Sequence, residues 1–280
     1  MKLFNDDCLK VLKQFDEESV DLVVTDCPYH IVSGGCTNDV VKIGRYTECS
    51  GIFQKARKRE SHGGCYVGDS QHVNLGGIFD EFDPTCYTKQ GKLFKHNEIK
   101  FSEWLPEIYR VLKNNTHCYI MINARNLKEL QQCAEDSGFI FQNLLIWDKG
   151  NATPNKFYMN ACELILMLRK GKAKNINNMG TKNILSVPNI IRNKQHPTEK
   201  PAELMQILIE NSSNKGDIVL DPFMGVGGVG VACKNCDRSF IGIEIDEKYY
   251  RIAEQRMISE TAENVQQTIF DYFNEQIIGD

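Results

Sequence analysis

The sequence predicts an α/β fold built on an open, mostly parallel sheet with helices on both faces. Short apolar runs, typical of buried strands, alternate with segments whose apolar residues recur at helical spacing. Two of these runs end in compact turns, Asp26-Cys27-Pro28-Tyr29 and Asp221-Pro222-Phe223-Met224-Gly225. A chain of 280 residues with 41% hydrophobic side chains can bury a core of the size that such a sheet requires. Alternation of strands and helices favours parallel pairing, because each crossover helix returns the chain to the same edge of the sheet.

The individual elements are expected in a regular order, within a single domain of residues 1–280. Seven strands are predicted, at residues 2–5, 20–25, 116–123, 142–148, 163–168, 217–220 and 240–246. Helices are predicted at residues 8–15, 101–113, 127–137, 198–208, from the glycine turn at 225–230 onward, and at 248–262. Thr198 is the predicted N-cap of the fourth helix. Glycine-rich residues 33–95 are predicted to be an insertion, and polar residues 170–195 a loop.

Composition and charge exclude several classes of protein. No apolar stretch reaches the length of a membrane span, and Asp6 and Asp7 stand where a signal peptide would need basic residues. An intracellular protein is therefore expected. The net charge of −4 argues against a wholly basic nucleic-acid binder. Basic residues nevertheless gather at 55–59 and at 169–194, where they could contact phosphates.

The eleven cysteines are expected to be reduced thiols, because their spacing does not recur and no secretory context is present. Cys233 and Cys236 form a Cys-x-x-Cys pair on a predicted helix, where packing is favoured over zinc or redox chemistry. No metal is assigned to the predicted site. A structural zinc within the insertion stays an alternative, although only His62-x-x-Cys65 has ligand-like spacing. The cluster there comprises Cys36, Cys49, His62, Cys65, His72, Cys86 and His96.

The turn Asp26-Cys27-Pro28-Tyr29 has the side chains needed to hold a planar amine. The Asp26 carboxylate can accept hydrogen bonds from the amine, and the Tyr29 ring can stack on its face. Pro28 fixes one backbone torsion between them. An accidental surface turn would explain this tetrapeptide taken alone.

The second turn has the features of a nucleoside-binding site. Gly225 and Gly227 would let the backbone approach a ligand closely, because glycine has no side chain. Glu244 follows about 20 residues later at the end of a predicted strand, where an acid can accept hydrogen bonds from ribose hydroxyls. The glycine spacing by itself leaves a nicotinamide cofactor open.

Taken together, the two turns and their order resemble the S-adenosylmethionine-dependent DNA amino-methyltransferases of the permuted β class. Three further segments resemble that family: 5–9, the helix at 104–113, and His196-Pro197-Thr198-Glu199-Lys200-Pro201. The resemblance implies a Rossmann-like, seven-stranded sheet in which the acceptor turn precedes the cofactor turn. It covers nearly all of the chain outside residues 33–95.

The resemblance also assigns roles to single residues. Asp26, Cys27, Pro28 and Tyr29 would form the catalytic turn, with the Asp26 carboxylate and the Cys27 carbonyl accepting from the amine. The residues implied to bind S-adenosylmethionine are Asp7, Cys8, Lys200, Asp221, Phe223, Gly225, Gly227 and Glu244. Among these, Glu244 would hold the ribose and Asp7 the adenine amine of the cofactor. A plain helix start is the alternative for Lys200-Pro201.

The reaction implied is methylation of the N6 amine of adenine in double-stranded DNA, with the base extruded from the duplex. N4-cytosine methylation and a non-catalytic DNA-binding subunit are the alternatives. Methyltransferases acting on RNA or on a glutamine amide generally carry the cofactor turn first. Target recognition is expected from residues 33–95 and 170–195. A homodimer, a separately encoded restriction endonuclease and a cytoplasmic location are also implied.

The sequence departs from the family pattern in two places. Cys27 stands where the family usually has proline, so the turn is less rigid although its carbonyl can still accept a hydrogen bond. A passive replacement is favoured over a reactive thiol, because methylation of an exocyclic amine requires no thiolate. Gly228-Val229 replaces a small polar pair and thereby loses a hydroxyl contact.

Overall fold

The computed structural model describes residues 1–28, 99–153, 158–190 and 200–258. Apart from residues 153 and 158–160, they belong to one compact unit. Tyr29, Thr198 and the insertion predicted at 33–95, with its cysteines and histidines, lie outside the described residues. Within the described ranges, no helix combines the length and the apolar character needed to cross a bilayer.

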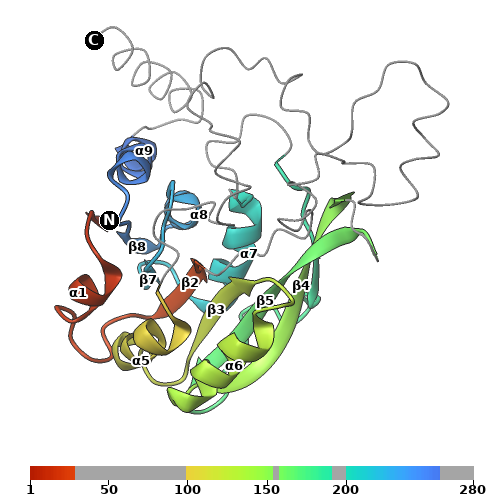
Figure 1. Ribbon diagram of the computed structural model, residues 1–280, viewed down its shortest axis with the longest axis horizontal. Helices are drawn as coiled ribbons and strands as arrows, with labels where there is room; N and C mark the ends of the chain where they lie inside the picture. Colours follow the sequence, from red (N-terminus) through yellow and green to blue (C-terminus); the bar gives the residue numbers. More distant parts are fainter. Residues whose placement is uncertain (29–98, 154–157, 191–199, 259–280) are drawn as a thin grey trace, which may run out of the picture. The chain divides into compact units, whose positions relative to one another are not determined.

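The described residues form one eight-stranded sheet, ordered β1-β8-β7-β2-β3-β5-β4-β6 (Figure 1). Strands β1, β8, β7, β2 and β3 pair in parallel, whereas β5 runs antiparallel to β3. The carboxyl ends of the five parallel strands therefore meet at one edge of the sheet, together with the amino end of β5. The strands are β1 (Lys2–Phe4), β2 (Leu22–Asp26), β3 (Thr116–Ile122), β4 (Ile140–Thr153), β5 (Asn160–Lys170), β6 (Ile184–Ser186), β7 (Ile218–Asp221) and β8 (Ser239–Ile243).

Helices cover both faces of the sheet, as the sequence predicts. Helices α1 (Cys8–Leu12), α5 (Phe101–Val111) and α6 (Leu127–Asp136) pack on one face. Helices α7 (Ala202–Ser212), α8 (Gly228–Asn235) and α9 (Glu247–Ile258) pack on the other (Figure 1). Alternate residues of β2 point to opposite faces, so that Val23 joins the first core and Leu22 and Val24 join the second.

The observed elements differ from the predicted ones at three points. The sheet has eight strands rather than seven, because β6 lies within the predicted loop 170–195 and pairs in parallel with β4. This three-residue strand, with only Leu185 buried, is too short to give a periodic signal. Strands β4 and β5 also extend beyond 142–148 and 163–168. The added residues 150–153 and 160–162, at the ends where the two strands approach each other in sequence, are exposed and give no strand signal.

The third difference is the start of α7. The N-cap of this helix is Pro201, with φ −58° and ψ 132°, so the prediction that Thr198 caps it was wrong. A residue before proline is disfavoured in the helical region, which keeps Lys200 out of the helix. Lys200 consequently lies outside α7, directly before its N-cap.

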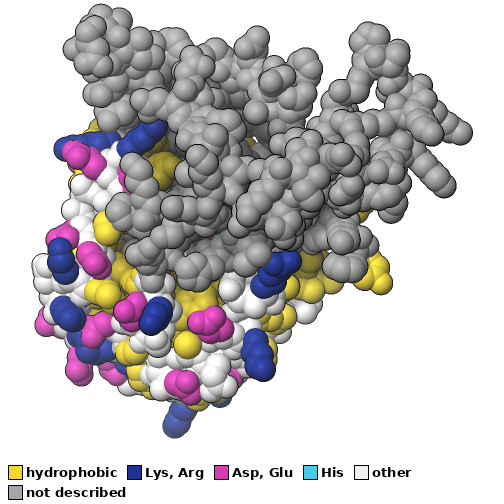
Figure 2. Space-filling model, viewed as in Figure 1, with side chains coloured by type: hydrophobic (Ala, Val, Ile, Leu, Met, Phe, Trp, Pro, Cys, Tyr) yellow, Lys and Arg dark blue, Asp and Glu magenta, His cyan; other side chains and the backbone are white. Residues whose placement is uncertain are grey.

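The visible surface of the described residues carries both signs of charge. Figure 2 shows lysine and arginine side chains interspersed with aspartate and glutamate on the face that bears α1, α5 and α6. Mixed charge of this kind keeps a protein soluble without creating a single-sign field. The charges that matter for the site are instead found at the sheet edge.

Candidate active site

The predicted site residues converge on the carboxyl edge of the parallel strands. Asp26 ends β2 and Asp221 ends β7, while Glu244 directly follows β8. Asp7 follows β1 and caps α1, because its Oδ1 accepts from the Leu9 N–H at 2.8 Å. In open α/β sheets ligands bind at this edge, so the topology brings both predicted turns to one place.

The Asp26 carboxylate faces a lysine ammonium. Lys200 Nζ lies 3.0 Å from Asp26 Oδ2 and 3.0 Å from Glu163 Oε2. The Lys200 side chain is only 9% exposed, and those of Asp26 and Glu163 are 25% and 29% exposed. Burial raises the pKa of Asp26, and nearby Glu163 raises it further, whereas Lys200 acts to lower it.

Glu163 has a second cationic partner, since Lys149 Nζ lies 3.5 Å from its Oε1. Burial opposes ionisation of Glu163, but Lys200 and Lys149 outweigh it and lower its pKa. Glu163 reaches the site because β5 is antiparallel to β3: Leu164 pairs with Ile122, the last residue of β3. The amino end of β5 therefore lies at the same edge as the carboxyl end of β2.

The Cys27 thiol points away from solvent and into the core. The residue is 2% exposed, and its Sγ donates to the Met121 carbonyl at 3.7 Å. Burial, reinforced by the negative charge of Asp26, raises the pKa of Cys27 well above its usual value. The thiol is therefore protonated and packed, in keeping with the predicted passive replacement.

Asp221 links the two turns through the adjacent strand β2. Thr25 donates from Oγ1 to Asp221 Oδ1 at 2.7 Å, and the Phe223 N–H donates to the same oxygen at 3.1 Å. Asp221 is 3% exposed. Burial raises its pKa to about 7, with Asp26 and Glu244 adding to the rise. The carboxyl group thus ties the start of the glycine turn to strand β2.

The glycine turn uses backbone conformations that favour glycine. Gly225 has φ +51°, and a Cβ added there would meet no atom within 4 Å. Gly227 has φ +80° and is the N-cap of α8. From α9, Arg256 donates to the carbonyl of Val226 at 2.8 Å. The turn is therefore held by α9 while its backbone at Gly225 borders open space.

Glu244 is anchored to this turn by backbone donors. The Gly225 N–H donates to its Oε2 at 2.9 Å, and the Asp246 N–H donates to its Oε1 at 2.8 Å. Burial nevertheless raises the pKa of Glu244. Each carboxylate oxygen keeps a lone pair for a further hydrogen bond, which is the arrangement that a pair of ligand hydroxyls requires.

Comparison with known proteins decides the family. A family profile described as DNA methylase, the N6/N4 methyltransferases, matches residues 20–255. The chain belongs to this family of DNA methylases. Because the matched residues include both turns, the family resemblance found in the sequence is confirmed.

Relatives of this DNA methylase cover nearly its whole length. The type II methyltransferase M2.DpnII of Streptococcus pneumoniae is 26% identical over 94% of this chain and 92% of its own. M.HpaI of Haemophilus parainfluenzae is 28% identical over 92% of this chain and 74% of its own.

Two solved structures share the fold. The complex of M1.HpyAVI with S-adenosylmethionine has a TM-score of 0.57 at 23% identity, over 91% of this chain and 98% of its own. The cytosine-N4-specific PvuII DNA methyltransferase has a TM-score of 0.61 at 16% identity, over 95% and 89%. The predicted Rossmann-like methyltransferase fold is thereby confirmed.

Several residues at the site of this methylase were missed by sequence reasoning. Glu163 and Lys149 lie on strands without a family motif, and only their polarity at the ends of apolar runs could have indicated them. Thr25 was read simply as part of a strand. Trp104, which packs edge to face on Phe223 at 5.1 Å, was noted only as a helix residue.

The structure of the methylase brings most predicted residues together but gives two of them structural surroundings. Cys8 is buried at 6% exposure, and burial raises its pKa to about 12. Its side chain therefore packs under α1. Lys200 was predicted on the cofactor side, yet its ammonium pairs with Asp26 and Glu163, while its backbone carbonyl lies near the glycine turn. A Cβ added at Gly228 would lie 3.8 Å from the Lys200 carbonyl oxygen.

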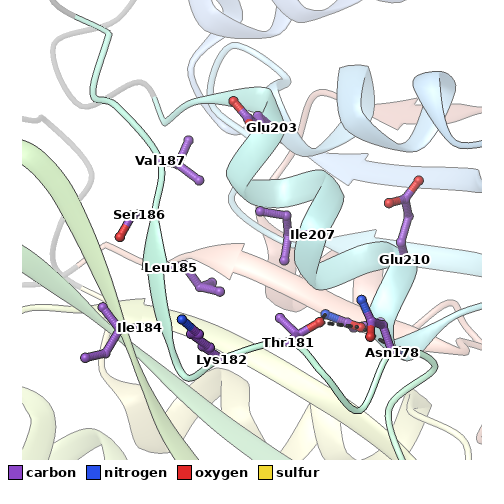
Figure 3. Close-up of a pocket in the computed structure, with 11 residues that line it drawn as sticks. Asn178, Thr181, Lys182, Ile184, Leu185, Ser186, Val187, Glu203, Ile207 and Glu210 are labelled. Carbon is purple, nitrogen blue, oxygen red and sulfur yellow. Dashed lines mark hydrogen bonds between the residues drawn. The ribbon is translucent and has the colours of Figure 1, made fainter.

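A cavity of about 360 Å³ lies elsewhere in the methylase, between α7 and the segment that contains β6 (Figure 3). Its lining includes Thr181, Lys182, Leu185, Ile207 and Asn211, and none of the predicted site residues. Within the described part of the chain, no group of three or more His, Cys, Asp or Glu side chains is arranged to hold a metal ion. Cys233, on α8, and Cys236, its C-cap, are free thiols buried in the core.

Proposed function

We propose that this methylase transfers a methyl group from S-adenosylmethionine to the N6 amine of adenine in double-stranded DNA. The observation that carries the proposal is the shared edge of the sheet. There the Asp26 carboxylate lies beside the turn that Glu244 and Asp221 fix, and Thr25-Oγ1 to Asp221-Oδ1 joins the two halves at 2.7 Å. An amine acceptor and a nucleoside site so joined suit a direct transfer between two bound reactants.

The residues around the glycine turn fit S-adenosylmethionine. Open space at Gly225 gives a ligand close access to the backbone, and the Glu244 carboxylate beside it can accept from ribose hydroxyls. Asp7 is half-buried at the same edge, suited to the cofactor's adenine amine. S-adenosylmethionine supplies an electrophilic methyl group on a positively charged sulfur.

The acceptor turn would prepare the amine for attack. An exocyclic amine is a weak nucleophile because its lone pair is delocalised into the ring. The Asp26 carboxylate and the Cys27 carbonyl would accept its two hydrogens and draw the nitrogen toward tetrahedral geometry. The lone pair would then form the new N–C bond as the C–S bond of the sulfonium breaks toward sulfur, and one N–H proton would pass to water. Tyr29, which lies outside the described residues, would stack on the extruded base.

The aspartate at the start of the turn favours adenine over cytosine, because the family resemblance associates Asp with adenine and Ser more often with cytosine. N4-cytosine methylation is the competing outcome. Recognition of the target through residues 33–95 and 170–195 stays a prediction. A homodimer, a separately encoded restriction endonuclease and a cytoplasmic location also stay predictions.

Tritiated methyl transfer to unmethylated plasmid DNA tests the proposal. We expect label in N6-methyladenine after digestion to nucleosides, and its loss in Asp26→Ala with cofactor binding retained. Asp237→Ala, which removes an exposed carboxylate paired with Lys215, serves as the matched control and should keep full activity. Label in N4-methylcytosine would overturn the choice of base. Full activity in Asp26→Ala would overturn the proposed role of the turn.

A further inference from the structure

Four charged side chains of alternating sign form a continuous chain at the acceptor side of the site. Lys149 pairs with Glu163, Glu163 with Lys200, and Lys200 with Asp26, at 3.5, 3.0 and 3.0 Å. They come from β4, β5, the residue before the N-cap of α7, and β2. Sequence positions far apart are thus joined into one ionic chain that ends on the predicted catalytic carboxylate.

The burial of this chain calls for a functional explanation. The side chains of Lys149 and Lys200 are only 11% and 9% exposed, so their charges are largely removed from water. Desolvation of ion pairs can outweigh their mutual attraction, so such pairs are weak evidence for a purely stabilising role. By contrast, the ions of the Lys215–Asp237 pair stay in contact with water, since their side chains are 77% and 67% exposed.

We propose that Lys200 is a positioning residue for the acceptor amine: its ammonium keeps the Asp26 carboxylate ionised and oriented, and Glu163 with Lys149 holds that ammonium in place. The inference rests on the proposed function, since it specifies how the acceptor side of the same site is maintained. It differs from the role implied by the family resemblance, in which Lys200 serves the cofactor.

The charges that face Asp26 explain why a lysine is needed. Glu163 shares Lys200 with Asp26 and raises the pKa of Asp26, and Asp26 in turn raises the pKa of Asp221 at the end of the adjacent strand. Glu244 and Cys27 add no positive charge. Among the residues that the structure describes, Lys200 is the cation that pairs directly with both Asp26 and Glu163. Without Lys200, Asp26 would be protonated up to a higher pH. A protonated carboxyl group accepts a hydrogen bond from the amine more weakly than a carboxylate does.

The pH dependence of methyl transfer tests the inference in the full-length protein. The probe is unmethylated plasmid DNA with tritiated S-adenosylmethionine at saturation. In Lys200→Met the acidic limb of the kcat profile should move upward by about one pH unit or more, because an opposite charge within hydrogen-bond reach typically shifts a carboxyl pKa that far. Lys200→Arg should restore the wild-type limb. The Kd for S-adenosylmethionine should stay within about twofold, given the side chain's position on the acceptor side.

A double variant separates charge from structure. With Lys200 removed, Glu163 acts on Asp26 only as a like charge, so Glu163→Gln added to Lys200→Met should move the acidic limb back toward lower pH. A merely structural lysine would give additive losses in rate and no reversal of the limb. Lys200→Gln, which removes the charge and keeps a hydrogen-bond donor, gives the same test should Lys200→Met fold poorly.

A direct measurement distinguishes failure of this inference from failure of the proposed function. Protein labelled with ¹³C at the aspartate carboxyl carbons is titrated by NMR, and the Asp26 signal is assigned from Asp26→Asn. The Asp26 pKa should rise in Lys200→Met and fall back in the double variant, whether or not the wild type methylates the plasmid. An Asp26 pKa unchanged by Lys200→Met, or a large loss of S-adenosylmethionine binding with an unchanged limb, would overturn the inference.

Discussion

Thr25 and Asp221 are joined across strands β2 and β7 by a hydrogen bond of 2.7 Å, with both residues almost completely buried. Thr25 immediately precedes the acceptor turn, and Asp221 begins the glycine turn. The two strands are parallel neighbours, with Leu22 opposite Val219 and Val23 opposite Leu220. One buried contact therefore fixes the separation of two turns that lie far apart in the sequence.

Loss of this contact should destabilise the protein. Thr25→Val keeps the shape of the side chain but leaves the Asp221 carboxyl with the Phe223 N–H alone among the contacts described above. We expect the free energy of unfolding to fall by about 1–3 kcal/mol, the usual cost of leaving a buried polar group short of a partner. Urea denaturation at pH 7 measures it.

Thr116→Val is the matched control for that experiment. The Thr116 hydroxyl donates to the Lys113 carbonyl at 2.6 Å, but at a half-buried position where water can replace it. Its loss should cost about 0.5–1 kcal/mol, in the range of an ordinary neutral hydrogen bond. Equal losses in the two variants would contradict a special role for the buried pair.

Asp221 should also make stability depend on pH. Burial raises the pKa of its carboxyl from 3.8 to about 7 in the folded protein. The folded state therefore binds this proton more tightly than the unfolded chain. The contribution of Asp221 to the free energy of unfolding is largest below pH 4, declines as pH rises toward about 7, and is constant above. One proton corresponds to a slope of about 1.4 kcal/mol per pH unit at most.

Asp221→Asn should remove that share of the slope, measured by urea denaturation at pH 5, 6 and 7 as the difference from wild type. Asparagine can still accept from Thr25, so the geometry is kept. Asp237→Asn is the control, because the pKa of this exposed carboxyl is lowered by Lys215 and cannot produce a decline over the same range. A difference between wild type and Asp221→Asn that is independent of pH would refute the prediction.

The sequence was sufficient to predict the parts of the site that lie at strand ends. Parallel strands deliver their carboxyl ends to one edge, so the predicted strands before Asp26, Asp221 and Glu244 implied their proximity. Strand order and side-chain pairing across the sheet were not readable. Glu163 reaches the site only because β5 is antiparallel to β3, a relationship that no local pattern in either strand encodes.

The same limit applies to Lys200. It was expected in a helix and on the cofactor side, but the direction of a long, flexible side chain depends on which charges surround it. Those charges come from β2 and β5, which are distant in sequence. The short strand β6 was missed for a related reason. Its three residues give no strand pattern, and it is defined by its pairing with the distant strand β4.

Glu244 should contribute to cofactor affinity through its charge. Both of its carboxylate oxygens accept backbone N–H bonds, at 2.9 and 2.8 Å. In glutamine one of these oxygens becomes an NH2 group, which would face a backbone N–H donor instead of accepting from it. We expect Glu244→Gln to raise the Kd for S-adenosylmethionine by about 10- to 100-fold, as for loss of a charge-assisted hydrogen bond. Isothermal titration calorimetry without DNA measures it.

Glu247→Gln provides the matched control for the calorimetry. It makes the same change of charge three residues away, at a side chain that is 73% exposed in the first turn of α9. Its Kd should equal that of wild type within error. A comparable loss in both variants would mean that general electrostatics, rather than the anchored carboxylate, determines the affinity.

Cys27 should resist thiol reagents in the folded protein. Its thiol is packed in the core with a pKa well above the usual value, whereas Cys162 is exposed. Iodoacetamide reacts with thiolates, so native protein at pH 7.5 should be alkylated at Cys162 and left intact at Cys27, with Cys27 reacting only after unfolding in urea. Peptide mapping by mass spectrometry reads both sites in one sample. Alkylation of Cys27 at a rate near that of Cys162 would show that the residue replacing the family's proline is a reactive thiol rather than a packed one.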